Sequence, residues 1–381
     1  MESHAEDGAE QLRLEARGVK AACAAMEREI AAGTTPGGVL GVMHEGKQWF
    51  YSAGYANPKP KQGQPVPASK DTLYDCASLT KVVVTLPLIL RLIDEGGLTL
   101  STKVSDILPS FGTAGKEEIT VGQLLTHTSG LQADMNLHSQ GWNREQMWDA
   151  VLSAPLVTKP NTEVIYSDLG YLTLGRIIER SLELPLDQAF KRWVLDPLGI
   201  CHATLTPSPE QASRYAATEY EDTIQDHLCG IVHDEKARAL GGVCGHAGLF
   251  ATAGDLLQYA RMWLAQGAIP ATASPEAGGG ESCILSRAAA VASTRTHTSH
   301  IQGSNRGLGW VLKGDKMDAS GDWMGPGCYG HTGFTGTSMW IDPELDLAVV
   351  LLTNRVYGGR SSSVTQLRAQ VHNALTGAVA W

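Results

Sequence analysis

The sequence lacks the features of a nucleic-acid-binding or membrane-spanning protein. Its 30 lysine and arginine residues are outnumbered by 40 aspartate and glutamate residues, and the two signs are interspersed. Because proteins that bind nucleic acid usually carry a basic patch, we expect no nucleic-acid partner. The longest largely apolar run, residues 82–90, is too short to cross a bilayer, so we expect no membrane span.

Secretion signals and cysteine pairs are also missing. The first 33 residues contain no apolar segment of the kind that signal peptides carry, which predicts a cytoplasmic protein as the sequence is written. A periplasmic or secreted protein whose signal had been removed would show the same pattern. The seven cysteines are odd in number and include no Cys-x-x-Cys pair, so free thiols are expected rather than disulfides or a zinc ribbon.

What is present indicates a globular protein with a mixed architecture. The 381 residues are 43% hydrophobic, enough for a sizeable core, and 42 glycines suggest many tight turns. Apolar spacing predicts one helix over residues 9–32, and two β-rich runs around the polar turn at 44–47 predict a hairpin. Helix and loop texture then follows for about 170 residues after Pro65. Further strands are predicted at 307–312, 328–333, 337–343 and 347–354, and a last helix at 361–375.

This order predicts one sheet built from both chain ends, with a helical insertion beside it and a cleft at their junction. We expect residues 1–33 to form an N-terminal helix packed on the sheet, followed by a single domain over 34–375. Its sheet part covers about 9–75 and 250–381, and its helical part about 76–249. The stretch 271–282 is interpreted as a flexible surface loop because the closing strands lie beyond it.

Ser78 and Lys81 form the only Ser-x-x-Lys of the chain. Apolar residues at helical spacing follow, up to Gly96 and Gly97, which places Ser78 in the first turn of a buried helix with Lys81 one turn further on the same face. A serine beside a base at a helix N-terminus suits nucleophilic catalysis. The structural alternative is an N-cap serine followed by a surface lysine. Pro87 should kink this helix, with no functional reason visible in the sequence.

Two further segments carry candidate site residues. Tyr166 and Asp168 lie on a loop just before a helical pattern, where the tyrosine can point into a cleft or pack half-buried. His331, Thr332 and Gly333 begin a predicted strand, and the histidine could equally face solvent.

Other patterns are weak. Residues 325–330 match GxGxxG, but they contain a proline and run into a strand, so a dinucleotide site is not expected. The groups His297/His300 and His233/Asp234/His246 lack a recognised metal-ligand spacing, so we expect polar loops there. We therefore expect neither a metal nor a cofactor.

The three motifs, in this order and with a helical insertion between the first and the last, resemble the penicillin-recognising serine hydrolases. This superfamily contains class C β-lactamases, D-alanyl-D-alanine carboxypeptidases, D-aminopeptidases and family VIII esterases. The resemblance covers about residues 30–375. It includes residues 125–131, LTHTSGL, which look like the HTSGL signature, and residues 232–235 and 245–250, which look like segments of the esterase or peptidase branch.

The resemblance implies a β-lactamase/transpeptidase-like α/β (α+β) fold with an antiparallel sheet. It makes Ser78 the acylated nucleophile, Lys81 its partner base and Tyr166 a general base or proton relay. The pKa of the lysine, of the tyrosine or of both would have to be lowered for base catalysis near pH 7. The oxyanion hole is carried over to the backbone amides of Ser78 and Phe334.

Two positions depart from the β-lactamase pattern. Asp168 stands where β-lactamases usually carry asparagine, and His331 stands where they usually carry lysine. Both changes make the site more negative, which favours neutral esters unless Arg355, just past the last strand, restores a positive charge. Together with Thr332 and Gly333, these residues are the expected substrate-binding set.

The expected function is hydrolysis of small-molecule esters or small amides through an acyl-enzyme. A peptidase for D-amino-acid-containing peptides and a weak β-lactamase are the alternatives within the class. A non-catalytic binding or scaffolding relative is the alternative outside it, and the intact Ser78, Lys81 and Tyr166 argue against that alternative. The sequence does not indicate an oligomeric state.

Overall fold

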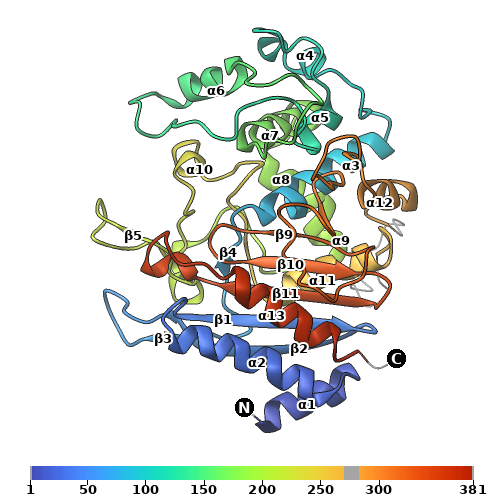
Figure 1. The fold of residues 1–381 in the computed structure, drawn as a ribbon. Helices are drawn as coiled ribbons and strands as arrows, with labels where there is room; N and C mark the ends of the chain where they lie inside the picture. The colour runs from blue at the N-terminus through green and yellow to red at the C-terminus, as the bar shows by residue number, and fades with distance from the viewer. Residues whose placement is uncertain (1, 270–282, 380–381) are drawn as a thin grey trace.

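A seven-stranded antiparallel sheet forms the centre of the molecule, and both ends of the chain contribute to it (Figure 1). The structure, a computed structural model, describes residues 2–269 and 283–379. The strand order is β3-β2-β1-β11-β10-β9-β8, which confirms the predicted sheet. The strands are β1 Gly37–His44, β2 Lys47–Asn57, β3 Val66–Pro67, β8 Val311–Leu312, β9 Tyr329–Thr332, β10 Ser338–Asp342 and β11 Leu347–Thr353.

Both faces of this sheet are covered. Helices α1 Glu2–Leu12, α2 Ala16–Ala31 and α13 Thr365–Thr376 pack on one face, and α11 Ala253–Leu264 packs on the other (Figure 1). Successive side chains of a strand point to opposite faces of the sheet. In β11, Val349 therefore packs in the core beside α1, α2 and α13, and Val350 packs in the core beside α11. A strand buried on both faces is therefore apolar throughout, as residues 347–352 are.

The start of the chain differs from the prediction. The single helix expected over 9–32 is wrong, because the helix is broken into α1 and α2 at residues 13–15. Arg13 adopts a left-handed conformation with φ 56°. Leu14 forms a β-bridge with Val379, and the amide of Glu15 donates to the carbonyl of Ala378 at 2.7 Å. A tertiary contact with the C-terminus thus interrupts a locally helical sequence.

The predicted strands are found with shifted ends. The hairpin turn consists of Glu45 and Gly46, both with positive φ (47° and 72°), as a two-residue turn between twisted strands requires. Strand β8 is shorter than the run 307–312 that predicted it. His331 lies near the end of β9 rather than at the beginning of a strand. The loop expected at 271–282 lies outside the described residues.

The helical insertion lies between β4 Tyr74–Asp75 and β7 Phe250–Ala251, which pair with each other. It stands on the opposite side of the sheet from α1 and α2 (Figure 1), and α12 Arg287–Ser293 follows it. None of the described helices has the length and hydrophobicity that a bilayer crossing requires. The insertion contains α3 Leu86–Asp94, α4 Val104–Ile107, α5 Val121–Leu125, α6 Arg144–Ser153, α7 Asp168–Leu182, α8 Leu186–Phe190, α9 Asp196–Leu198, α10 Glu235–Ala239 and the strand pair β5 Tyr220–Glu221 and β6 Asp226–His227.

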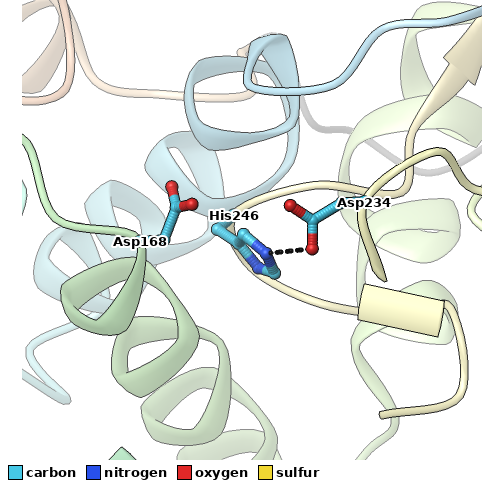
Figure 2. Close-up of side chains that lie close together, drawn as sticks. All are labelled: Asp168, Asp234 and His246. Atoms are coloured by element: carbon cyan, nitrogen blue, oxygen red, sulfur yellow. Dashed lines mark hydrogen bonds and ion pairs between the residues drawn. The ribbon is translucent and has the colours of Figure 1, made fainter. Parts of the chain in front are cut away.

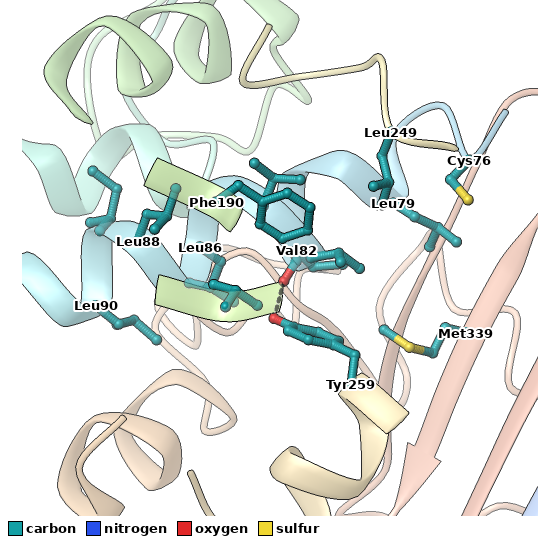
Figure 3. Close-up of a cluster of buried hydrophobic side chains, with 14 of the residues drawn as sticks. Cys76, Leu79, Val82, Leu86, Leu88, Leu90, Phe190, Leu249, Tyr259 and Met339 are labelled. Carbon is teal, nitrogen blue, oxygen red and sulfur yellow. Dashed lines mark hydrogen bonds between the residues drawn. The ribbon is translucent and has the colours of Figure 1, made fainter. Parts of the chain in front are cut away.

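Pro87 does not disrupt the nucleophile helix, contrary to the sequence-based expectation. Residues Lys81–Thr85 form a π-helical turn, in which the amide of Leu86 donates to the carbonyl of Lys81, five residues earlier. Continuing this pattern, Pro87 would face the carbonyl of Val82 but has no N–H to donate. The hydroxyl of Tyr259, from α11, donates to that carbonyl at 2.6 Å instead (Figure 3). The π turn and Tyr259 together accommodate the proline.

Candidate active site

Ser78 lies on a strained turn between β4 and the nucleophile helix. The preceding residue, Ala77, has φ 45°, a conformation that costs energy for a residue with a Cβ. The buried carboxylate of Asp75 stabilises this turn by accepting the amide of Ala77 at 2.8 Å and that of His233 at 2.7 Å. Ser78 remains partly exposed while its neighbours are buried. The local fold therefore presents this hydroxyl to solvent.

Lys81 lies one turn further along, as predicted, but it is fully buried rather than at the surface. Its ammonium donates to the Ser78 hydroxyl at 3.0 Å, to Asp168 Oδ1 at 2.8 Å and to the carbonyl of His246 at 3.0 Å. Burial alone would lower the pKa of Lys81, but the Asp168 carboxylate and the nearby Tyr166 outweigh burial and raise the pKa. Lys81 is thus held as a cation, and the lowered lysine pKa that base catalysis would need is not found.

Tyr166 is half-buried beside this lysine. The Lys81 Nζ atom lies 4.9 Å from the centre of the phenol ring. The imidazoles of His127 and His331 pack against the ring with centroid distances of 4.5 Å and 5.8 Å. His127 also accepts the amide of Ser167 at 3.0 Å, which fixes the loop that carries the tyrosine. Ser167 is the N-cap of α7, so the predicted loop before a helix is confirmed.

The segment after β9 is bound to the nucleophile turn. The hydroxyl of Thr335 donates to the carbonyl of Asp75 at 2.6 Å, and that of Thr337 donates to the carbonyl of Cys76 at 3.1 Å. Phe334 follows this strand end, and within the described residues neither its amide nor that of Ser78 donates to another protein group. Two free amides near the nucleophile are what an oxyanion hole requires.

His331 does not line the cavity. It is buried behind Tyr166, and burial together with Lys81 and Arg306 lowers its pKa to about 3. The imidazole is therefore neutral, and the solvent-facing alternative is wrong. The structure places Thr332, Gly333 and Phe334 in the cavity wall and His331 against the tyrosine.

Lys236, which the sequence analysis did not identify, is the second cation of the site. Its ammonium lies 3.2 Å from Asp168, 3.4 Å from Asp234 and 2.7 Å from Asp134. Asp234 in turn bonds to His246 at 3.1 Å (Figure 2). Burial would raise the pKa of Asp168, but Lys81, His246 and Lys236 hold it well below its usual range. These contacts form a closed ring. It runs from Lys81 to Asp168, Lys236, Asp234 and His246, whose backbone carbonyl accepts a hydrogen bond from Lys81.

This ring explains why the three possible metal ligands do not favour a metal ion. Oxygen atoms of Asp168 and Asp234 and a nitrogen of His246 lie within 4.8 Å of one another (Figure 2). Both carboxylates already contact ammonium groups, so a divalent cation would have to displace Lys236. His233, expected in a polar loop, lies in the loop before α10 and pairs with Glu219 at 2.9 Å.

A cavity of about 570 Å³ opens over Ser78. The four carboxylates in its wall each contact a cation, whereas two of its arginines do not contact a carboxylate among the described residues. Arg355 donates to the carbonyls of Arg360 and Ser362 and stacks over Phe334 at 4.7 Å. Arg368 donates to the carbonyls of Gly333 and Thr337. The end of the cavity beside Phe334 therefore carries unbalanced positive charge.

Comparisons with known proteins agree with this geometry. The sequence model of the family described as Beta-lactamase matches residues 23–373. A putative D-alanyl-D-alanine carboxypeptidase of Escherichia coli (strain K12) is 32% identical over 326 residues, which cover 77% of this chain and 71% of that protein. An N-acetylmuramyl-L-alanine amidase of Bacillus subtilis (strain 168) is 32% identical over 367 residues, covering 87% and 79%.

Solved structures share the fold at lower sequence identity. EstCE1, a hydrolase with promiscuous acyltransferase activity, has a TM-score of 0.72 at 24% identity and covers 95% of this chain and 99% of its own. A class C beta-lactamase from Rhodobacter sphaeroides has a TM-score of 0.71 at 23% identity, with 94% and 99% covered. These similarities confirm the predicted β-lactamase/transpeptidase-like fold.

Proposed function

The chain belongs to the beta-lactamase family and is a serine hydrolase, and we propose that it cleaves an ester or small amide bond through an acyl-enzyme on Ser78. The observation that carries the proposal is the 3.0 Å hydrogen bond from the Lys81 ammonium to the Ser78 hydroxyl in the wall of a cavity that Tyr166 also lines. Three residue types that nucleophilic acyl transfer needs thus lie together: a nucleophile, a cation and a proton acceptor.

In the first half-reaction, Tyr166 accepts the proton of Ser78 as Oγ attacks the substrate carbonyl carbon. The negative charge that develops on the carbonyl oxygen is stabilised by the amides of Ser78 and Phe334. Because Asp168 holds Lys81 as an ammonium ion, we assign to Lys81 an electrostatic role beside Oγ rather than the role of the base. Tyr166 then gives the proton to the leaving alcohol or amine, and the acyl group stays on Ser78.

In the second half-reaction, water attacks the acyl carbon and loses its proton to Tyr166. The bond between the acyl carbon and Ser78 Oγ breaks, the tyrosine returns the proton to Oγ, and the acid product leaves.

A second candidate is hydrolysis of an amide in a substrate that carries a free carboxylate. Arg355 and Arg368 favour it, because among the described residues both guanidinium groups donate to backbone carbonyls and to no carboxylate, at the Phe334 end of the cavity. The relatives named as a putative carboxypeptidase and an amidase support the same choice. The neutral-ester prediction, drawn from Asp168 and His331, allowed for a positive charge from Arg355 but did not include Arg368.

Mass spectrometry tests the nucleophile. A fluorophosphonate or a slow ester should add one adduct, on the peptide that contains Ser78, and Ser78→Ala should abolish turnover. Ser361 lines the same cavity and is exposed, so Ser361→Ala is the matched control and should leave turnover within a few-fold of wild type. An adduct on another serine, or full activity in Ser78→Ala, contradicts the proposal.

A substrate panel separates the two candidates. We would compare kcat/KM for a neutral p-nitrophenyl ester, a cephalosporin, a D-alanyl-D-alanine peptide and N-acetylmuramyl-L-alanine. Preference for a carboxylate substrate that is lost in Arg355→Gln supports the second candidate. Preference for the neutral ester that persists in Arg355→Gln supports the first.

A further inference from the structure

Near Tyr166, but not in the cavity wall, Arg306 and Asp315 form a buried ion pair. We propose that Arg306 is a positioning residue that stabilises the phenolate form of Tyr166, the form that accepts the Ser78 proton. The inference rests on the base role proposed for Tyr166. It adds a residue that lies outside the three sequence motifs and does not itself contact the cavity.

Arg306 is unusual because its charge is buried with few partners. Its side chain is 1% exposed, and its Nε lies 3.3 Å from Asp315 Oδ2. Its Nη2 donates to the sulfur of Met317 at 2.7 Å, whereas Nη1 is buried and lacks a partner among the described residues. A buried donor left unsatisfied is costly to the fold, so its retention calls for a reason beyond stability.

The position of Arg306 supplies that reason. Its Cζ lies 5.9 Å from the centre of the Tyr166 ring, while Lys81 Nζ approaches the same ring at 4.9 Å. The ring therefore lies near two cations, one on the nucleophile helix and one on the segment before β8. Nearby positive charge stabilises the negatively charged form of an acid.

The other groups around the ring do not provide a cation. Burial, followed by the charge of Arg306, lowers the pKa of His127 well below its usual range, and the pKa of His331 is about 3. Both imidazoles are thus neutral. The charged or titratable groups near the tyrosine come from several elements. They are Lys81 of the nucleophile helix, His127, Asp168 and Tyr171 of α7, Arg306 before β8, and His331 of β9.

Because Asp315 carries the opposite charge to Arg306, replacing it should change the stability of the phenolate in the opposite direction. Its carboxylate is buried and also accepts the amides of Asn305 and Met317, each at 2.9 Å. It partly cancels the charge of Arg306 at the tyrosine. Removing the arginine charge should therefore make the phenolate harder to form, and removing the carboxylate charge should make it easier to form. A purely structural pair would instead be damaged alike by both changes.

The experiment measures kcat/KM against pH for wild type, Arg306→Met, Arg306→Lys and Asp315→Asn, using the substrate that acylates Ser78 in wild type. A unit charge near 6 Å, partly cancelled by its partner, should move the acidic limb on the order of one pH unit. We expect the limb to move to higher pH in Arg306→Met, to stay near wild type in Arg306→Lys, and to move to lower pH in Asp315→Asn.

Lys116→Met is the matched control. Lys116 is also a fully buried cation, but it donates to the carbonyls of Leu152 and Ala154 at the end of α6. Its loss should lower thermal stability and leave the acidic limb in place. If Arg306→Met does not fold, the shift to lower pH expected for Asp315→Asn remains measurable against the unshifted limb expected for Arg306→Lys.

The inference is overturned if Ser78 is acylated in every variant while the limb stays fixed, or moves in the same direction in Arg306→Met and Asp315→Asn. Absence of the Ser78 adduct in wild type would overturn the proposed function instead, so the two failures are distinguishable.

Discussion

Replacing Asp168 by asparagine should destabilise the fold, because it leaves a buried ammonium without its counter-ion. The carboxylate lies 2.8 Å from the fully buried Lys81 and 3.2 Å from Lys236. Asparagine keeps the size and a hydrogen-bond acceptor but removes the negative charge. Lys81 would then keep neutral acceptors, namely the asparagine oxygen, the Ser78 hydroxyl and the carbonyl of His246, but no negative charge beside its ammonium.

The size of the effect follows from two opposing contributions. At 2.8 Å and an effective dielectric constant of about 20, two unit charges attract by about 6 kcal/mol. Removal of both charges from water offsets much of this attraction, yet removing one partner alone typically costs about 3–5 kcal/mol. We therefore expect Asp168→Asn to lose about 3–5 kcal/mol of unfolding free energy at pH 7.

The dependence on pH gives the same prediction a second readout. The folded-state pKa of Asp168 lies below its unfolded value, so its stabilising contribution is present above about pH 4 and is lost as the pH falls further. The difference in stability between wild type and Asp168→Asn should shrink below about pH 4.

Urea denaturation at several pH values measures both quantities. Asp134→Asn is the matched control, because the Asp134 side chain is 63% exposed and contacts Lys236 alone among the cations of the ring. It should change stability by about 0–1 kcal/mol. Equal losses in the two variants, or a difference that does not depend on pH, would refute the reasoning.

Three further outcomes are expected. Lys81→Ala and Tyr166→Phe should each lower kcat by about 10²–10⁴ in a steady-state assay, and a rate near that of wild type would remove the residue from the mechanism. Tyr259→Phe should cost about 1–3 kcal/mol in urea denaturation, because the carbonyl of Val82 loses its donor, while kcat stays within a few-fold. Gly333→Ala places a Cβ 2.4 Å from a backbone oxygen of the nucleophile turn, so kcat should fall steeply; unchanged kinetics would contradict the close packing.

The sheet could be predicted from the sequence because its signals are local. Alternation or continuous apolarity over a few residues is sufficient to mark β1, β10 and β11, and the polar turn at 44–47 is sufficient to mark the hairpin. The break at Arg13 could not be predicted in this way, because it depends on a bridge between Leu14 and Val379. Pro87 was misjudged for the same reason, since Tyr259 comes from a helix far along the chain.

In the candidate site, too, the contacts between residues close in sequence could be predicted, and those between distant segments could not. Ser78 and Lys81 are related by one helical turn, so their spacing alone predicts their contact. The partners of Lys236 and Arg306 come from distant segments, and only the fold brings them together. The polar residues that begin α10 and the arginine directly before the run 307–312 are the sequence signals that could have pointed to these two residues.

The closed ring also explains why the family motif does not by itself assign the base. Ser-x-x-Lys is compatible with a neutral or a charged lysine, and the choice depends on what else the lysine contacts. Here Asp168 contacts Lys81 directly, and Lys81, His246 and Lys236 hold the pKa of Asp168 well below its usual range, against the opposing effects of burial and of Asp234. With Lys81 held as a cation beside Ser78, the other residue that the family resemblance implies as base is Tyr166, which lies in the cavity wall. In the proposed mechanism, the charge of one aspartate, at a position where β-lactamases usually carry asparagine, decides between the two candidate bases.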